Sequence, residues 1–279
     1  MGRDEGFFSA KDNLRLFWET TRPSDGRVAK AHVGIVHGYA DHAGRYRKTI
    51  DALAGEGFVV HAFDYRGHGQ ADGRRGHCDR FEEYVDDLER FWQRVREAAG
   101  KTPAFLLAHS HGALMTLHFL RRRPEGLRGT VLSAPYLKLA FTPNPLQVIA
   151  ARAVGVIVPW LPQKMPLAPE TLTRDTQEQH QAAHDPLYNR TLTVRWFVEC
   201  TRAQAQATRL GPVVTLPVFT LFGSEDAVAS PTATRAFFDT IASNDKKLKE
   251  YPGMRHEPLN EIGREEVWRD ISGWISAHL

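Results

Sequence analysis

Ser110 lies in a short polar turn, HSHG, between the apolar run PAFLLA and the helix-like segment ALMTLHFL. A strand, a tight turn and a helix can raise a serine hydroxyl above a sheet, where it attacks a carbonyl carbon. The crowded backbone of such a turn requires small residues on both sides of the serine. Ala108 and Gly112 fill these two positions. A serine here can also cap the following helix, so the motif alone leaves both interpretations open.

A serine nucleophile needs a general base and an acid that orients it. His256 is the predicted base, because it lies in the loop YPGMRHEPLNE between a short strand and the last helix. The acid is predicted in FTLFGSEDAVAS, where Glu225 and Asp226 both follow a strand end. Ligand sites gather at the carboxyl ends of parallel strands, so either carboxylate is suitably placed.

The oxyanion that forms during attack needs N–H donors, which we expect in VGIVHGYADHAGRY. His37 and Gly38 end a buried run, and a glycine lets the backbone turn and approach a substrate closely. The backbone amides of Tyr39 and His111 would then point at the oxyanion. The other interpretation is that HGY is only a strand-to-helix turn.

Three other chemistries are excluded by spacing. GHGQADG lacks the glycine spacing of a dinucleotide site and opens no helix. The residues after His256 do not form the H-E-x-x-H pattern of zinc proteases. His109 and His111 have no carboxylate or cysteine cluster beside them, so we predict no catalytic metal and no cofactor.

Five short apolar runs must position these residues: AHVGIVHG, GFVVHAFD, PAFLLAH, GTVLSAP and PVFTLFG. Continuous apolar runs bounded by turn residues are typical of strands buried on both faces of a parallel sheet. Residues 81–100 and the last segment, from Val267 onwards, show the apolar spacing of amphipathic helices. The alternation predicts an α/β fold with a mostly parallel central sheet flanked by helices. NLRLFWET alternates between apolar and polar residues and is predicted to be an antiparallel edge strand.

This alternation of strand and helix patterns stops between Tyr136 and about Leu210, where prolines cluster and no buried-strand run occurs. We therefore expect a core formed by residues 1–136 and 211–279, with a mainly helical insertion over the sheet at residues 137–210.

The chain resembles the monoacylglycerol lipase and lysophospholipase branch of the α/β-hydrolases over nearly its full length. HGYADHAGRY matches the family pattern H-G-x-x-[ED]-H-x-x-R-Y, and FDYRGHGQADGRRGH, AHSHG, LFGSEDAVAS and YPGMRHEPLNE extend the match. The resemblance implies the α/β-hydrolase fold, with Ser110 as nucleophile, His256 as base and Asp226 as acid. It also implies Tyr39 and His111 as oxyanion-hole amides, and a cap between the sixth and seventh strands.

The cap contains one strongly apolar stretch, PLQVIAARAVGVIVPWLP. It is either an ordinary buried helix against the sheet or a lid whose apolar face meets an acyl chain or a membrane surface. If it is a lid, the candidate substrate-binding residues are Val154, Ile157, Trp160 and Trp196. The chain departs from the family at Ala108 and Ala71, where glycine and serine are usual.

Composition limits the partners. The chain has 279 residues, of which 42% are hydrophobic and 25% charged, and its net charge of +3 is too small to indicate a nucleic-acid partner. Arg121–Arg123 is interpreted as a solvated helix end. Two cysteines form no disulfide framework, and MGRDEGFFSA lacks the apolar core of a signal peptide. No run reaches the ~20 apolar residues of a membrane span, so we expect a cytoplasmic protein.

The expected function is a serine ester hydrolase that releases a fatty acid from a lipid monoester, first of all a monoacylglycerol, through an acyl-enzyme on Ser110. The expected partners are a small lipid ester and, through the cap, a membrane surface. A general carboxylesterase for short or aryl esters, or a lysophospholipase, is the alternative. A non-catalytic ligand-binding protein on the same scaffold is disfavoured, because all three triad candidates are present.

Overall fold

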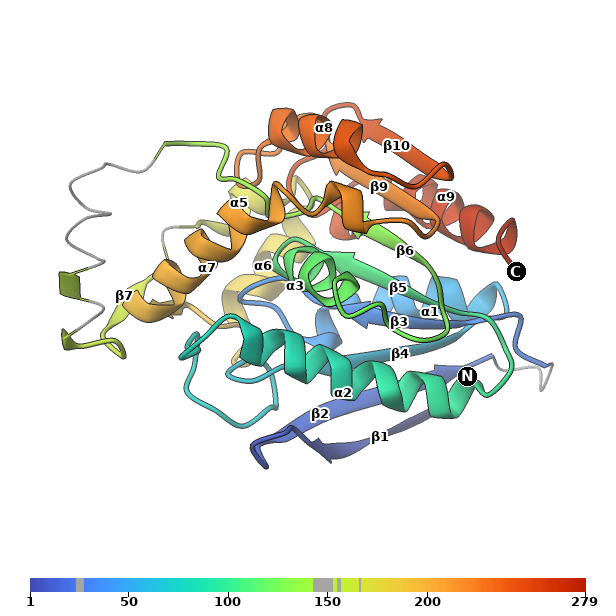
Figure 1. Cartoon of the computed structure of the whole chain (residues 1–279), viewed down its shortest axis with the longest axis horizontal. Coiled ribbons are helices and arrows are strands. Elements are labelled where there is room, and N and C mark those ends of the chain that lie inside the picture. Colours follow the sequence, from blue (N-terminus) through green and yellow to red (C-terminus); the bar gives the residue numbers. More distant parts are fainter. Residues whose placement is uncertain (24–27, 143–152, 155–156, 166) are drawn as a thin grey trace.

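A mostly parallel sheet forms the centre of the molecule. The computed structural model describes residues 1–23, 28–142, 153–154, 157–165 and 167–279 (Figure 1). Within these ranges, eight strands pair in the order β1-β2-β4-β3-β5-β6-β9-β10. They are β1 (Gly2–Ser9), β2 (Arg15–Arg22), β3 (His32–Val36), β4 (Val59–Asp64), β5 (Ala104–His109), β6 (Leu127–Ser133), β9 (Val218–Gly223) and β10 (Lys246–Tyr251). β2 is antiparallel to β1 and β4, and the other neighbours run parallel.

The five apolar runs form β3, β4, β5, β6 and β9, which confirms the predicted fold class. Every residue of β3, β4, β5 and β9 is buried, because helices cover both faces of a parallel sheet. The predicted edge position of NLRLFWET was wrong. Its segment forms β2, which is largely buried because it lies between two strands of the sheet. The exposed strand β1 pairs along its outer side and forms the edge.

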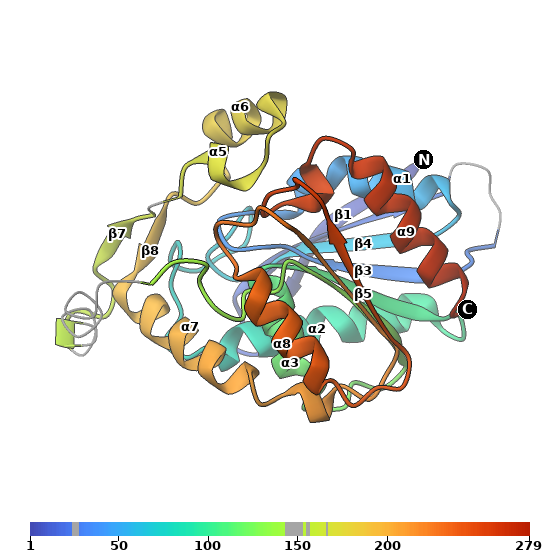
Figure 2. The ribbon, with the colours of Figure 1, turned by 90° about the horizontal axis from the view of Figure 1, so that it is seen from above.

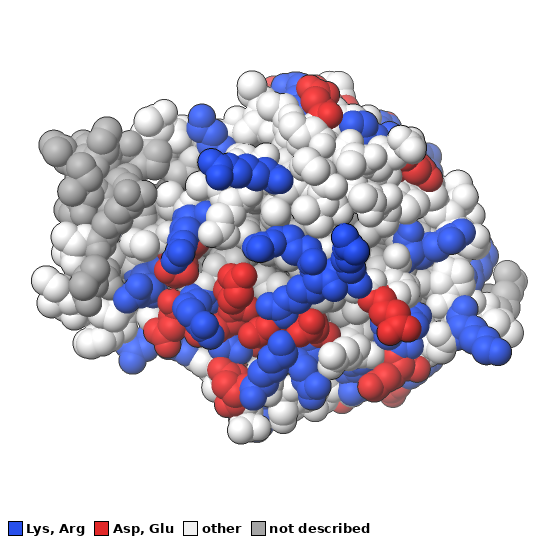
Figure 3. All heavy atoms as spheres, viewed as in Figure 1, with Lys and Arg blue, Asp and Glu red and all other residues white. Residues whose placement is uncertain are grey.

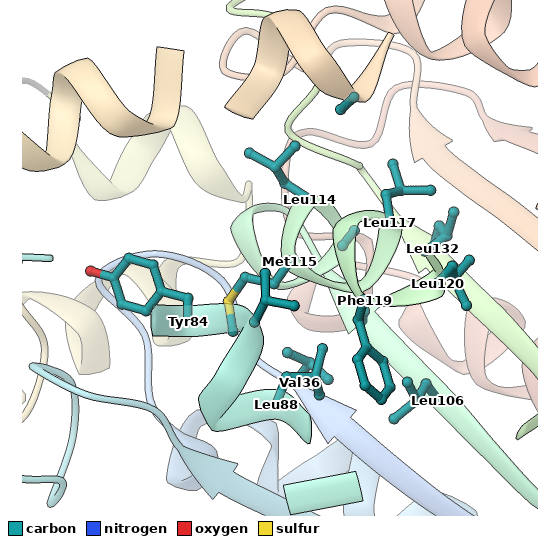
Figure 4. Packing of buried hydrophobic residues seen from close by; sticks show 14 of the residues in the cluster. Val36, Tyr84, Leu88, Leu106, Leu114, Met115, Leu117, Phe119, Leu120 and Leu132 are labelled. Atoms are coloured by element: carbon teal, nitrogen blue, oxygen red, sulfur yellow. The ribbon is translucent and has the colours of Figure 1, made fainter. Parts of the chain in front are cut away.

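Helices cover the two faces of the sheet (Figures 1 and 2). α1 (Arg47–Gly55) and α9 (Arg264–Ser276) pack on one face, and α2 (Glu82–Ala99), α3 (His111–Leu120) and α8 (Pro231–Thr240) pack on the other. The predicted helix at 81–100 is α2, which ends at Gly100 with a φ of 59°. Figure 4 shows how Leu88 of α2, Met115 of α3 and Val36 of β3 meet in the core between these elements.

The segment between β6 and β9 leaves the main sheet and forms a separate group of elements at one side of it (Figure 2). It contains β7 (Pro162–Lys164), α5 (Pro169–Leu172), α6 (Thr176–His184), β8 (Thr191–Thr193) and α7 (Val194–Ala207), followed by the 3-10 turn η2 (Gly211–Val213). The expectation of a mainly helical insertion omitted the antiparallel ribbon of β7 and β8, whose strands are too short to give a sequence pattern. Much of the apolar stretch that begins at Pro145 lies outside the described residues.

Polar contacts attach the inserted segment to the core. The Tyr39 hydroxyl donates to the Thr191 carbonyl oxygen over 2.7 Å. His42 Nε2 lies 2.8 Å from Asp185 Oδ2, a carboxylate just after α6. The Asn189 amide donates to the Ala40 carbonyl oxygen over 2.8 Å. These contacts fix the end of α6 and the start of β8 against the loop that follows β3.

The surface carries both signs of charge. Figure 3 shows Lys and Arg side chains interspersed with Asp and Glu over the face that carries α2 and α3. Arg122, in the triple arginine, lies 2.7 Å from Asp86 and 3.0 Å from Glu89, which agrees with a charged helix end. The edge strands β1 and β10 are rich in charged residues, including Lys246, Lys247 and Lys249 on β10.

Among the described helices, none combines the length and the apolar character that crossing a membrane would require.

The packing of α2 on the sheet gives a test of the fold. Leu88 is fully buried, so Leu88→Ala should lower the free energy of unfolding by about 2–5 kcal/mol through lost apolar contacts and a residual cavity. Glu97 lies on the exposed side of the same helix, and Glu97→Ala should change it by less than about 0.5 kcal/mol. Urea unfolding of both variants measures the difference, and equal losses would contradict the described orientation of α2.

Candidate active site

Ser110 occupies a strained turn between β5 and α3. Its φ is 51° and its ψ is −114°, a conformation that residues with a side chain rarely adopt. Its amide donates to the Ser133 carbonyl over 2.9 Å, and its own carbonyl accepts from the Leu114 amide. The side chain makes no capping hydrogen bond to α3. The geometry therefore does not support the N-cap interpretation, and backbone strain of this kind is common at functional sites.

Close packing explains the small residues around this turn. A Cβ atom at Gly112 would overlap the carbonyl oxygens of Val36 and His37, so α3 begins directly against the end of β3. A Cβ atom at Gly38 would lie 3.0 Å from the His109 ring and 3.4 Å from the Ser110 Cβ. The HGY turn and the serine turn are thus in contact with each other.

Three predicted residues that lie far apart in the sequence meet here. The distance from His256 Nε2 to Ser110 Oγ is 2.8 Å, and that from His256 Nδ1 to Asp226 Oδ2 is also 2.8 Å. A carboxylate can only accept, so Nδ1 carries a proton, and the neutral imidazole then presents a lone pair at Nε2 to the serine hydroxyl. The other oxygen of Asp226 accepts from the amides of Val228 and Ala229, both over 2.8 Å. Glu225 is exposed, so the structure brings Asp226 and not Glu225 to the histidine.

The electrostatics of the site centre on His256. Burial by itself would lower its pKa, but the adjacent carboxylate of Asp226, together with Glu257 and Asp41, holds the pKa above the ordinary histidine value. Arg45 pairs with both Asp41 and Glu257, and all three side chains are buried. Burial raises the pKa of Asp41, whereas at Glu257 the attraction of Arg45 overcomes burial and lowers the pKa.

The structure places the amides of Tyr39 and His111 at this turn. His111 follows the serine as the first residue of α3, where backbone N–H groups favour negative charge. Tyr39 follows Gly38, which contacts Ser110. Within the described ranges, neither amide N–H donates to a backbone carbonyl oxygen.

A cavity of about 820 Å³ lies over the serine, within the usual size range of small-molecule sites. Its floor includes Ser110 and His256, and most of the wall is apolar. Side chains from the inserted segment form much of that wall, among them Val154, Leu161, Met165, Leu192, Trp196 and Phe197. Among the described residues, no group of three or more His, Cys, Asp or Glu side chains is arranged to hold a metal ion.

The predicted substrate-binding residues divide into two pairs. Val154 and Trp196 line the cavity. Ile157 and Trp160 do not, and their exposed fractions are 76% and 51%. Their assignment to the cavity wall is therefore corrected: both side chains are exposed and lie outside the cavity lining.

Several wall residues were not predicted from the sequence. Tyr136 and Leu139 follow β6, and Tyr188 precedes β8, each in a segment without apolar periodicity. No sequence pattern identifies such residues, because they come together only where the inserted segment and the core line one cavity.

Known proteins resemble this chain over most of its length. The family model described as serine aminopeptidase, S33, matches residues 27–263. The chain is 30% identical to the monoglyceride lipase of Homo sapiens over 95% of this chain and 88% of the relative. It is 28% identical to phospholipase YtpA of Bacillus subtilis over 94% of this chain and 99% of the relative.

A solved lipase structure also resembles this chain over its full length. The crystal structure of the Paleococcus ferrophilus monoacylglycerol lipase superimposes with a TM-score of 0.81 at 28% identity, and the match covers 100% of both chains. The predicted resemblance is thereby confirmed over the full length. The chain belongs to the serine aminopeptidase S33 family and is a monoglyceride lipase-like α/β-hydrolase.

Proposed function

We propose that this protein is a serine ester hydrolase that releases a fatty acid from monoacylglycerol. The observation that carries the proposal is the hydrogen-bonded series from Ser110 through His256 to Asp226 at the floor of a largely apolar cavity. An apolar cavity suits an acyl chain, and the series supplies an activated nucleophile. The monoglyceride and monoacylglycerol lipases among the relatives support the same substrate class.

In the proposed reaction each of these groups has one role. His256 Nε2 removes the proton from Ser110 as Oγ attacks the ester carbonyl carbon. The negative charge that develops on the carbonyl oxygen is held by the amides of Tyr39 and His111. His256 then returns the proton to the leaving glycerol oxygen, which breaks the ester bond and leaves an acyl-enzyme. Water, deprotonated by the same histidine, releases the fatty acid and restores the serine.

Residues 137–210 act as a cap in this proposal. Val154 and Trp196 contribute to the wall that contacts the acyl chain. Ile157 and Trp160 instead present apolar side chains to the outside, and we assign them to contact with a membrane surface that holds the substrate. Leu161 and Phe141 are exposed as well, but both also line the cavity.

A lysophospholipid is the second candidate substrate. Phospholipase YtpA matches the chain over nearly the whole length of both proteins, and Lys164 of β7 lines the cavity. A phosphate-bearing headgroup would find a cation there. The test is to measure kcat/KM on monoacylglycerol and lysophosphatidylcholine of equal acyl length and on p-nitrophenyl acetate. The lipid with the higher value is the preferred substrate, and the highest value on p-nitrophenyl acetate would indicate a general carboxylesterase.

The first prediction concerns the triad. Ser110→Ala and His256→Ala should each lower kcat by about 10⁴-fold or more, and Asp226→Asn should have a smaller effect. Glu225→Gln is the matched control and should leave kcat within about two-fold, because that carboxylate is exposed. Steady-state kinetics on a soluble monoacylglycerol measures all four variants. A damaging Glu225→Gln beside a benign Asp226→Asn would show that the acid is misassigned.

The second prediction concerns pH. His256 must be neutral at Nε2 to accept the serine proton, so kcat/KM falls as pH drops through its pKa. Because the carboxylates raise that pKa, the midpoint should lie above about 6.5, the ordinary histidine value.

Asp226→Asn removes the nearest carboxylate and leaves burial, which lowers the pKa, so the midpoint should move to lower pH in this variant. The pH dependence of kcat/KM on a chromogenic ester tests both statements. A profile that stays flat between about pH 5 and 9, with chemistry rate-limiting, would argue against His256 as the base.

The third prediction concerns the acyl chain. Each buried methylene contributes at most about 0.8 kcal/mol, which limits the gain to roughly 15-fold in kcat/KM per two carbons. Ordering the chain reduces this gain, so we expect a several-fold rise per two carbons from about C4 to C10. Val154→Asp places a charge in the cavity wall and should flatten the rise.

Ile157→Asp is the matched control, because it makes the same kind of change three residues along on an exposed side chain. On monomeric substrates it should retain the wild-type dependence on chain length. On phosphatidylcholine vesicles that contain monoacylglycerol, it should weaken vesicle binding. A wild-type preference for C2 and C4 esters would contradict the lipid assignment and favour the short-ester carboxylesterase.

A further inference from the structure

The peptide that joins Gly38 to Tyr39 is held by two buried side chains. Its carbonyl oxygen, on Gly38, accepts from the Tyr65 hydroxyl over 2.9 Å and lies 2.7 Å from His37 Nδ1. A carbonyl has no proton to give, so Tyr65 and His37 must both donate. This requirement fixes the tautomer of His37, whose neutral ring carries its proton on Nδ1.

The direction of this carbonyl sets the direction of the Tyr39 N–H. A peptide unit is planar, and in its trans form the C=O and N–H bonds point in opposite directions. Two donors on the Gly38 oxygen therefore hold the Tyr39 N–H on the opposite side of the peptide, away from Tyr65 and His37. The preceding peptide is held as well, since the Gly38 amide donates to the Tyr46 hydroxyl over 3.2 Å.

Tyr65 also reaches the second oxyanion donor. Its hydroxyl oxygen lies 3.3 Å from Nδ1 of His111, the residue whose backbone N–H begins α3. Tyr65 is completely buried and its ring stacks on His37 with a centroid distance of 4.1 Å. Burial lowers the pKa of both His37 and His111, so both rings stay neutral and can take part in this arrangement as Nδ1 donors.

We propose that Tyr65, together with His37, is a positioning residue for the oxyanion hole, a role that rests on the ester hydrolysis proposed above. Its hydroxyl contacts both polypeptide elements that supply an oxyanion N–H. Hydrogen bonds accepted by the Gly38 oxygen also polarise the peptide and strengthen its N–H as a donor, an effect that a low dielectric enhances. Tyr65 lies in FDYRGHG, a motif for which the triad and the cavity provide no role.

Tyr65→Phe removes only the hydroxyl and retains the ring that stacks on His37. Loss of one oxyanion donor costs about 10²–10³ in kcat, so loss of its orientation should lower kcat by about 10- to 100-fold. KM should stay within about two-fold, because the oxyanion forms only after the substrate binds. Affinity for an alkyl trifluoromethyl ketone, which forms a tetrahedral adduct with the serine, should fall by the same factor as kcat.

Tyr84→Phe is the matched control. Tyr84, a core residue labelled in Figure 4, is equally buried, and its ring lies 5.3 Å from that of Tyr65. Its hydroxyl donates to the His77 carbonyl over 3.1 Å and not to the Gly38 peptide. Tyr84→Phe loses the same hydroxyl oxygen from the same core but breaks no contact with the Gly38 peptide. Its kcat and its affinity for the ketone should therefore remain at the wild-type level. A general disturbance of the core would affect both variants alike.

A second pair of variants tests the same peptide independently. His37→Leu removes the other donor to the Gly38 oxygen and should also lower kcat. His37→Asn restores an N–H close to the position of Nδ1 and should recover most of the loss. This pair decides the question if Tyr65→Phe proves unfolded in a thermal melt.

Failure of the positioning role and failure of the proposed function would give different results in these experiments. Wild-type kcat and wild-type ketone affinity in Tyr65→Phe, with Ser110→Ala inactive, would overturn the positioning role and leave the proposed function intact. Equal losses in Tyr65→Phe and Tyr84→Phe, or no recovery in His37→Asn, would reduce Tyr65 and His37 to core residues. Full activity in Ser110→Ala would instead refute the proposed function itself.

Discussion

The close approach of α3 to the end of β3 is the constraint on which the site depends. Gly112 touches the backbone carbonyls of Val36 and His37, and any larger residue there would push the helix away from the sheet. The short turn that this contact demands forces Ser110 to a positive φ and lifts its hydroxyl toward the cavity. The same contact brings the Gly38 turn against the serine, so a single packing arrangement positions both Ser110 and the Gly38–Tyr39 peptide.

The site combines an apolar cavity with a buried charge cluster, and the two are compatible because Arg45 lies between the carboxylates. Asp41 and Glu257 would otherwise place two negative charges beside the carboxylate that orients His256, and burial would make all three costly. Arg45 offsets the charges of Asp41 and Glu257, while the carboxylates hold the pKa of His256 above its ordinary value and the substrate meets mainly apolar surface. Such an environment suits the imidazolium that forms during ester attack.

Elements with a repeated pattern were predictable from sequence, and single contacts between distant residues were not. Buried runs identified most of the parallel strands, and a serine and an acid that follow two of them, with a histidine in the loop after the charged strand β10, identified the residues that the structure brings together. β1 was missed because an edge strand tolerates charged residues such as Asp4 and Glu5. The apolar stretch around Ile157 could not show which side faces the cavity, and Tyr65 reaches Gly38 across 27 positions, a contact that only the folded sheet creates.

The charged residues of β10 have a consequence for how copies of this protein meet. An open sheet ends in strands whose outer backbone groups can pair with a strand from another molecule, which is a route to aggregation. β10 is one such end, and its sequence KKLKEY carries three lysines in six residues. A second copy paired here would have to accommodate three lysine side chains, two of which are already held in place: Lys246 by backbone carbonyl oxygens, and Lys249 by Glu266 and Asp270. The lysines therefore oppose growth of the sheet into an assembly of stacked chains and keep the strand that precedes the catalytic histidine loop unpaired on its outer side.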